Sequence, residues 1–263
     1  MTEVNKTLYI PLYGKALVSR KGIILRDRKA EKIWEKVNFP LGGKSKSKWL
    51  AYYMGMRACV FDEWMRERCT AEKDALVLHI GCGLDSRAER VGTENAWYDI
   101  DFPDVIAERR KYFKESENYT MLPADVRGEG WLSSIPKNKK AIVVMEGVSM
   151  YFAPEELKKL LSRLCGHFCD VYLLLDAYTV FAAKASKYKN PINEVGVTDV
   201  CGYDRGEDIC EGTGLLFVCG HDITPEGKIN ELHGAEKFIF RKLYSGSIAK
   251  KMYRMYEYEK RTV

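Results

Sequence analysis

The residues best suited to chemistry in this chain follow four short apolar segments. Gly81-Cys82-Gly83 ends the first segment, and acidic residues end the next three, namely Asp99 and Asp101, then Asp125, then Glu146. Glycine lets the backbone approach a ligand closely because it has no β-carbon. A carboxylate about 20 residues further on can accept hydrogen bonds from both hydroxyls of a ribose. Asp125 could likewise accept from an adenine amino group, so the set predicts a nucleoside-binding site.

These residues can meet only if the apolar segments are neighbouring parallel strands. The sequence predicts strands at residues 75–80, 97–101, 119–122, 141–145 and 171–175. Charged helical segments separate them, one running to about Lys114 and one beginning at Pro154. Strands that alternate with helices indicate the α/β class, with a parallel sheet covered on both faces. In such open sheets ligands bind at the carboxyl ends of the strands.

The glycine turn also bears on which nucleoside is bound. Dinucleotide sites use Gly-x-Gly-x-x-Gly, and the third glycine permits close helix packing. Here Ser86 stands where that glycine would be, and Asp85 lies next to the turn, where its charge would repel a pyrophosphate. A cationic sulfonium with no phosphate tolerates acids better. The pattern therefore favours S-adenosylmethionine, with a nicotinamide or flavin dinucleotide as the alternative.

The segments outside the strands divide into a helical start and a mixed end. Residues 1–70 are predicted to form an N-terminal helical cap within the same domain as the core, residues 71–263. An irregular insertion at about 177–213 is expected to shape the substrate pocket. Phe181, Tyr188 and Tyr203 would make that pocket aromatic. Further strands are predicted at 214–218 and 237–243, and the basic tail at 250–256 is expected to be an amphipathic helix or a strand.

Several motifs, taken in order, resemble those of a known family. They are residues 7–16, Arg57 followed by Phe61-Asp62, residues 79–87 with Arg90, residues 99–103, residues 124–127 and residues 146–152. Together they resemble the leucine carboxyl methyltransferase family, and in particular its bacterial, polyketide-tailoring branch. The resemblance runs from about residue 6 to residue 243.

The resemblance implies a class I methyltransferase fold: a Rossmann-like sheet with helices on both faces, an N-terminal helical cap and an insertion after the fifth strand. It implies S-adenosylmethionine as the cofactor and methyl transfer to a carboxylate or hydroxyl oxygen of a small molecule. Two alternatives stay open. The acceptor could be the C-terminal carboxyl of a protein, or the chain could bind the cofactor without catalysis.

The resemblance also assigns roles in holding the cofactor. Arg57 and Lys15 would hold the methionine carboxylate, and Glu146 would hold the methionine ammonium. Gly81 and Gly83 would lie beneath the ligand. Asp101 would bind the ribose, with Asp99 as second choice, and Asp125 and Val126 would bind the adenine. A guanidinium suits a carboxylate because it can bind it with two parallel hydrogen bonds.

No catalytic base is predicted from these motifs. A carboxylate acceptor is already ionised and needs none, whereas a phenol would benefit from one. Tyr151 is the candidate residue for the acceptor pocket. His221 and His233 are the alternatives that could serve a hydroxyl acceptor.

Composition excludes several classes of function. The chain has 263 residues and a net charge of +5, which by itself predicts no nucleic-acid partner. It contains no run of ~18 apolar residues and no signal-peptide pattern, so neither a membrane partner nor export is expected. The eight cysteines are scattered, which favours reduced thiols in the cytoplasm. Residues 165–169 lack a second pair of ligands, so no metal site is expected. The oligomeric state stays open.

Overall fold

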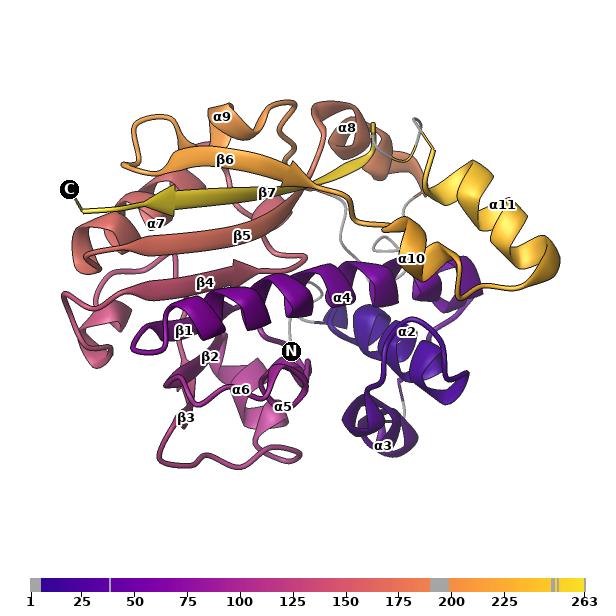
Figure 1. Ribbon diagram of the computed structural model, residues 1–263, viewed down its shortest axis with the longest axis horizontal. Coiled ribbons are helices and arrows are strands. Elements are labelled where there is room, and N and C mark those ends of the chain that lie inside the picture. Colours follow the sequence, from indigo (N-terminus) through magenta and orange to yellow (C-terminus); the bar gives the residue numbers. More distant parts are fainter. Residues whose placement is uncertain (1–5, 38, 190–198, 247–248, 250, 263) are drawn as a thin grey trace.

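A seven-stranded sheet forms the middle layer of the molecule (Figure 1). The computed structural model describes residues 6–37, 39–189, 199–246, 249 and 251–262. The strands are β1 (Leu76–Ile80), β2 (Trp97–Asp101), β3 (Tyr119–Pro123), β4 (Ala141–Met145), β5 (Val171–Tyr178), β6 (Leu216–His221) and β7 (Tyr253–Lys260). Their order is β3-β2-β1-β4-β5-β7-β6. Strands β1 to β5 are parallel, and β7 runs antiparallel to both β5 and β6.

Alternate residues of the central strands pack against opposite layers. Val77 and Val144 belong to the apolar cluster that includes helix α4 (Lys48–Ala71). Leu78 and Val143 belong to the cluster on the other face, which includes α7 (Pro154–His167). Successive side chains of a strand point to opposite faces, so these continuous apolar runs are explained by burial on both sides.

The N-terminal quarter is helical, as its sequence pattern indicated. It contains α2 (Tyr9–Arg20), α3 (Arg28–Lys36), the short 3₁₀ turn η1 (Gly43–Lys46) and α4. Asp27 caps α3 by accepting a hydrogen bond of 2.8 Å from the backbone N–H of Ala30. In Figure 1, α4 crosses the front of the sheet, and α2 lies below the right-hand part of α4.

The remaining helices connect the strands. They are α5 (Arg87–Val91), α6 (Pro103–Arg109), η2 (Trp131–Ser134), η3 (Ser149–Tyr151), α7, α8 (Val180–Lys189), α9 (Gly206–Cys210), α10 (Glu226–Ile229) and α11 (Gly234–Tyr244). In Figure 1, α8, α10 and α11 lie toward the end of the sheet where the β4 and β6 arrows point. Within the described residues, no helix is long and apolar enough to cross a membrane.

The structure corrects the C-terminal predictions. The strand predicted at residues 237–243 is wrong, because this segment lies within α11. Its run of aromatic and β-branched residues is typical of strands, but only Phe240 is fully buried, stacked against Tyr244. The seventh strand is instead formed by the tail. The sixth strand, Leu216–His221, begins two residues later than predicted. The segment predicted as an irregular insertion contains the helices α8 and α9.

Candidate active site

The glycine turn after β1 has a geometry that only glycine satisfies well. Gly81 has φ of +71°, and a β-carbon there would lie 2.2 Å from a methyl carbon of Val148. Gly83 has φ of +50°, and its N–H donates to Oδ2 of Asp101 at 2.8 Å. The turn is therefore fastened to the end of the neighbouring strand β2, and both glycines line a cavity at the carboxyl end of the sheet.

Asp101 presents its carboxylate to this cavity, which has a volume of about 600 Å³. Its Oδ1 accepts the N–H of Phe102 at 2.8 Å. Burial raises the pKa of Asp101 to about 6, although the two backbone N–H groups oppose that shift. Each carboxylate oxygen has two acceptor positions, so Asp101 retains capacity for two further donors.

Asp99, two residues earlier on β2, points into the protein core instead. Its Oδ1 lies 2.9 Å from Nδ1 of His79 and accepts from the Trp97 indole at 2.9 Å. Its Oδ2 is paired with Arg109. Burial would raise the pKa of Asp99, but Arg109 and His79 lower it to about 2. Asp99 lines neither the large cavity at the glycine turn nor the cavities next to it, so its geometry does not suit the second-choice ribose role.

The far end of the same cavity is formed by the turn after β3. Asp125 and Val126 both line it. The carboxylate of Asp125 is held by its own neighbour, because Arg127 donates to Oδ2 at 2.7 Å and to Oδ1 at 2.9 Å. Arg127 also lies over the Phe102 ring, 5.5 Å from its centroid. The predicted adenine-binding residues therefore line the same cavity as the glycine turn.

Arg57 and Glu146 form an ion pair beside the cavity at the glycine turn. The guanidinium of Arg57, on α4, lies 2.9 Å from Oε1 of Glu146, which follows β4. Arg87 binds the other carboxylate oxygen. Both side chains of the Arg57–Glu146 pair are about 95% buried. Burial would raise the pKa of Glu146, but Arg87 and Arg57 outweigh it and lower the pKa to about 2. Glu146 is thus ionised at neutral pH.

Asp176 is a further acid of this cluster that the sequence analysis did not single out. It lies on β5, and its Oδ2 is 3.2 Å from Nη1 of Arg57. Its Oδ1 accepts the N–H of Gly147 at 2.6 Å. Complete burial raises its pKa to about 6, although Arg57 opposes that shift. The signal for it was its place near the end of the fifth predicted strand, as with Asp101 and Glu146.

Lys15 reaches the glycine turn from α2. Its Nζ lies 2.8 Å from Oδ2 of Asp85, and both side chains are buried. Arg90 also binds Asp85, at 2.6 Å. A small cavity of about 50 Å³ lies here, and its walls include Lys15, Arg57 and Glu146. Because cations balance the charge of Asp85, its expected repulsion of a pyrophosphate carries less weight than the sequence suggested.

A second, apolar cavity of about 460 Å³ adjoins the first. Thr7, Glu146, Gly147 and Tyr151 line both cavities. Four further tyrosines line the second cavity, namely Tyr53, Tyr178, Tyr244 and Tyr253. Tyr253 also accepts a hydrogen bond of 3.1 Å from Arg57. The candidate acceptor-pocket residue Tyr151 therefore stands at the junction.

Two of the three aromatic residues expected from the insertion, Phe181 and Tyr203, do not line this second cavity. Phe181 is 65% exposed, and Tyr203 is buried in the cluster on the α7 face. The side chain of Tyr188 lies outside the described residues. The two histidines proposed for a hydroxyl acceptor, His221 and His233, line neither of the two large cavities. Besides Tyr151 on η3, the tyrosines that line the second cavity come from α4, β5, α11 and β7.

Comparison with known proteins decides the family. A sequence model of the leucine carboxyl methyltransferase family matches residues 3–165, which is more than half of the chain. The chain belongs to the leucine carboxyl methyltransferase family. This methyltransferase uses S-adenosylmethionine and transfers the methyl group to oxygen.

Two curated relatives extend beyond the family match. The methyltransferase is 31% identical over 201 residues to the tetracenomycin polyketide synthesis O-methyltransferase TcmP of Streptomyces glaucescens, covering 75% of this chain and 74% of the relative. It is 28% identical over 190 residues to the S-adenosyl-L-methionine-dependent methyltransferase dpfgK of Gibberella zeae, covering 65% and 63%. The family suggested by the sequence motifs is thereby confirmed.

Solved structures share the fold. A putative methyltransferase from Thermobifida fusca superposes with a TM-score of 0.55 at 14% identity, covering 96% of this chain and 94% of that chain. The magnesium protoporphyrin IX methyltransferase of Synechocystis with bound S-adenosylhomocysteine gives a TM-score of 0.54 at 12% identity, covering 89% and 93%. The predicted class I methyltransferase fold is confirmed.

The residues at the carboxyl edge fit the cofactor chemically. Its ribose needs an acceptor for two hydroxyls, and the partly buried Asp101 lines the larger cavity. Its amino acid end carries one positive and one negative charge, and Glu146, Arg57 and Lys15 line the small cavity beside the glycine turn. The sequence placed Asp101, Glu146, Arg57 and Lys15 near one another, as the structure does. It did not indicate the roles of Arg87 and Asp176, or the four tyrosines Tyr53, Tyr178, Tyr244 and Tyr253 of the second cavity.

Proposed function

We propose that this methyltransferase methylates the carboxylate of a small, largely apolar aromatic molecule. The observation that carries the proposal is the tyrosine-lined cavity that adjoins the larger cavity at Tyr151 and Glu146. When bound, the cofactor supplies a methyl group on a sulfonium sulfur. The second cavity, of about 460 Å³, has the size typical of small-molecule sites, which are mostly apolar with a few polar groups.

The charges around this cavity favour an acceptor that is already ionised. Among its described lining residues there is no histidine, lysine or aspartate, and Arg57 is its only cation. The one acid, Glu146, is held as a carboxylate by Arg57 and Arg87. Its pKa of about 2 makes it a weak base. A carboxylate needs no deprotonation before it attacks a methyl group, whereas a phenol does.

Aromatic acceptors suit the shape of the walls. Tyr178 and Tyr253 meet edge to face, with ring centroids 5.0 Å apart, and Tyr53 lies 6.4 Å from Tyr253. Such rings prefer offset or edge-to-face contacts with another aromatic ring. By its name, the relative TcmP serves the synthesis of a polyketide. That name fits an acceptor of this kind.

The proposal includes how this chain would hold the cofactor. Asp101 would accept both ribose hydroxyls, and Asp125 with Val126 would bind the adenine. Glu146 would accept the methionine ammonium, while Arg57 and Lys15 would donate to its carboxylate. Gly81 and Gly83 would let the backbone pass beneath the ligand. The methyl group would then face Tyr151, at the junction of the two cavities, where a bound acceptor and the aromatic side chains would keep water away from it.

The acceptor class is tested with deuterated-methyl S-adenosylmethionine. The purified protein is incubated with planar aromatic carboxylic acids, with matched phenols, with the amides of the same acids and with a peptide ending in leucine. The proposal predicts label on the acids only, released by mild base as expected for an ester. Label only on phenols, stable to base, would contradict the carboxylate assignment. Label only on the peptide would establish a protein C-terminus as the acceptor.

A further inference from the structure

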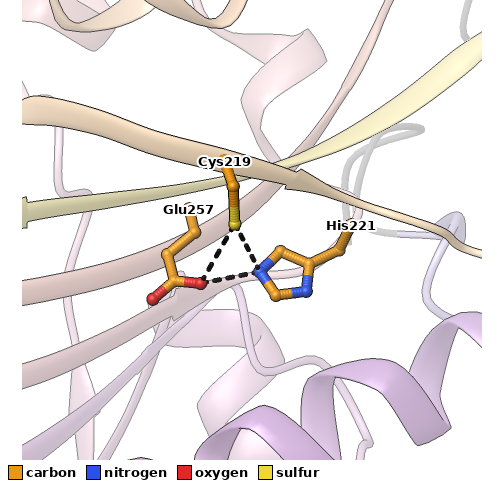
Figure 2. A group of neighbouring side chains, drawn as sticks. All are labelled: Cys219, His221 and Glu257. Carbon is orange, nitrogen blue, oxygen red and sulfur yellow. Dashed lines mark hydrogen bonds and ion pairs between the residues drawn. The ribbon is translucent and has the colours of Figure 1, made fainter.

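Three potential metal ligands converge on one face of the sheet edge, outside both large cavities. Cys219 and His221 lie two residues apart on β6, and Cys219 pairs across the ladder with Glu257 of β7. Residues two apart on a strand share a face. Figure 2 shows the thiol, the imidazole and the carboxylate pointing toward one another. The backbone pairing of β6 with β7 therefore holds all three side chains together.

The distances between the ligand atoms are close to those of a tetrahedral zinc site. Sγ of Cys219 lies 3.6 Å from Nε2 of His221 and 3.7 Å from Oε2 of Glu257. With usual zinc–ligand bond lengths, these edges of a tetrahedron measure about 3.5 Å. The His221–Glu257 distance is 2.7 Å, and it would have to widen by roughly 0.6 Å to reach the corresponding edge. Small side-chain rotations are sufficient for that change.

The surroundings hold the ligands in place. Arg68 of α4 binds Oε1 of Glu257, and this contact leaves Oε2 directed toward Cys219 and His221. Such outer partners are usual for metal-binding carboxylates. Glu257 is buried, whereas Cys219 is the only exposed thiol of the eight cysteines, all of which the structure describes. The cluster can therefore be reached from solvent.

We propose that Cys219, His221 and Glu257 form a zinc-binding site that fastens the edge strand β6 to β7. Thiolate, imidazole and carboxylate are all zinc ligands, and three protein ligands leave a fourth position for water. The bound ion would replace the proton on the thiol, which is released to solvent. Strand β7 begins at Tyr253, which lines the apolar cavity. Zinc would thus stabilise the strand pair from which that wall residue extends.

The test measures zinc binding by the full-length protein after treatment with a chelator. Equilibrium dialysis against Zn²⁺ gives the stoichiometry and the dissociation constant, and Co²⁺ reports thiolate ligation through its charge-transfer absorption. We expect one Zn²⁺ per chain with micromolar or tighter binding, and a higher melting temperature with Zn²⁺. We expect Cys219→Ser and His221→Gln to weaken zinc binding at least tenfold and to remove both the thermal shift and the cobalt band.

Cys169→Ser is the matched control. Cys169 is partly exposed and belongs to the Cys165–His167–Cys169 sequence, the other zinc candidate of this chain. This variant should bind zinc like the wild type. The proposal is overturned if the wild type binds no zinc at these concentrations, or if Cys219→Ser binds it as the wild type does. It is also overturned if Cys169→Ser, rather than Cys219→Ser, abolishes binding. Binding of S-adenosylhomocysteine verifies that each variant is folded.

Discussion

Arg57 and Glu146 are 89 residues apart in the sequence and form a buried ion pair of 2.9 Å. Their sequence motifs suggested that they bind the two charged groups at the amino acid end of the same ligand, the methionine carboxylate and the methionine ammonium. In the structure each neutralises the other, with Arg87 and Asp176 as further partners. In the proposed site, the methionine end of the cofactor would therefore meet a set of alternating charges that is already assembled without the ligand.

The first prediction concerns Arg57. Replacing it in Arg57→Met leaves Glu146 and Asp176 buried with one cation fewer, and breaking a buried pair in this way costs about 3–5 kcal/mol of folding free energy. The deficit should shrink as the pH falls from 8 to 5.5, because the orphaned carboxylates can then take up protons. Urea denaturation at both pH values measures it. A stability within 1 kcal/mol of the wild type (about the error of such a comparison) would contradict the network as described.

The second prediction separates Asp101 from its acidic neighbour. Asp101→Asn should weaken S-adenosylhomocysteine binding more than tenfold, because hydrogen bonds to a charged group contribute about 1.5–3 kcal/mol. Asp104→Asn is the control, since Asp104 lines the same cavity but accepts the N–H of Val105 within the first turn of its own helix α6. We expect less than about a threefold loss there (under 1 kcal/mol). Calorimetric titration measures both. Equal affinity losses in the two variants would remove Asp101 from the ribose role.

The third prediction concerns Asp99, which faces the core. Asp99→Asn leaves Arg109 buried without its anionic partner, and we expect a loss of about 3 kcal/mol or more of stability. The fraction that remains folded should still bind S-adenosylhomocysteine with an affinity near that of the wild type. Thermal denaturation and calorimetry at low temperature measure the two effects separately. A stable variant that fails to bind the cofactor would show that Asp99, and not Asp101, contacts it.

The fourth prediction concerns Tyr151 at the junction of the cavities. Tyr151→Phe keeps the ring and removes one hydroxyl, so cofactor affinity should stay within twofold of the wild type (about 0.4 kcal/mol). Turnover or the choice among acceptors should change instead. Titration and the labelled-methyl assay measure these effects. A large loss of cofactor binding would move Tyr151 into the cofactor site.

The fifth prediction concerns pH. Burial raises the pKa of Asp101 to about 6, so this group takes up a proton as the pH falls through that value. The neutral acid is a poorer acceptor, and cofactor affinity should decrease from pH 7.5 to pH 5. The contribution of this group to folding stability changes in the opposite sense. Because its pKa is raised in the folded state, the free energy of unfolding increases as the pH falls from about 6 to the ordinary carboxyl pKa of about 3.9. Weaker binding at pH 5 is therefore not explained by unfolding through this group.

Asp101→Asn also serves as the control for the pH effect. Asp176 has a pKa of about 6 as well, raised by burial next to Arg57. If Asp101 is responsible, the variant should bind weakly at both pH values with a much shallower pH dependence. An undiminished dependence in Asp101→Asn would assign the titration to Asp176.

The sheet could be predicted from sequence because each strand is a short apolar run with a chemical signal at its end. The predicted strand at residues 141–145 coincides with β4, and that at 97–101 coincides with β2. The last part of the chain lacks such signals. The segment around Phe238 and Phe240 resembles a strand, yet Phe240 packs against Tyr52 from helix α11. Tertiary contact overrides local preference there.

The cofactor-contacting candidates were accessible to sequence reasoning because they sit in motifs at strand ends. Apart from Tyr151, the tyrosine-lined cavity was not, since its other four tyrosines come from four elements far apart in the chain. Tyr53 and Tyr253 are 200 positions apart and lie ring to ring at 6.4 Å. No spacing rule connects such residues before the fold is known. The same holds for Glu257, which meets Cys219 only through the antiparallel pairing of β6 with β7.

The most direct test of the central claim is a crystal structure of the protein with S-adenosylhomocysteine. We expect both ribose hydroxyls within about 3.2 Å of the Asp101 carboxylate. We expect the amino acid end of the ligand among Lys15, Arg57 and Glu146, and its sulfur facing Tyr151 and the apolar cavity. A ribose bound elsewhere than Asp101, or a sulfur directed away from the tyrosine-lined cavity, would contradict it.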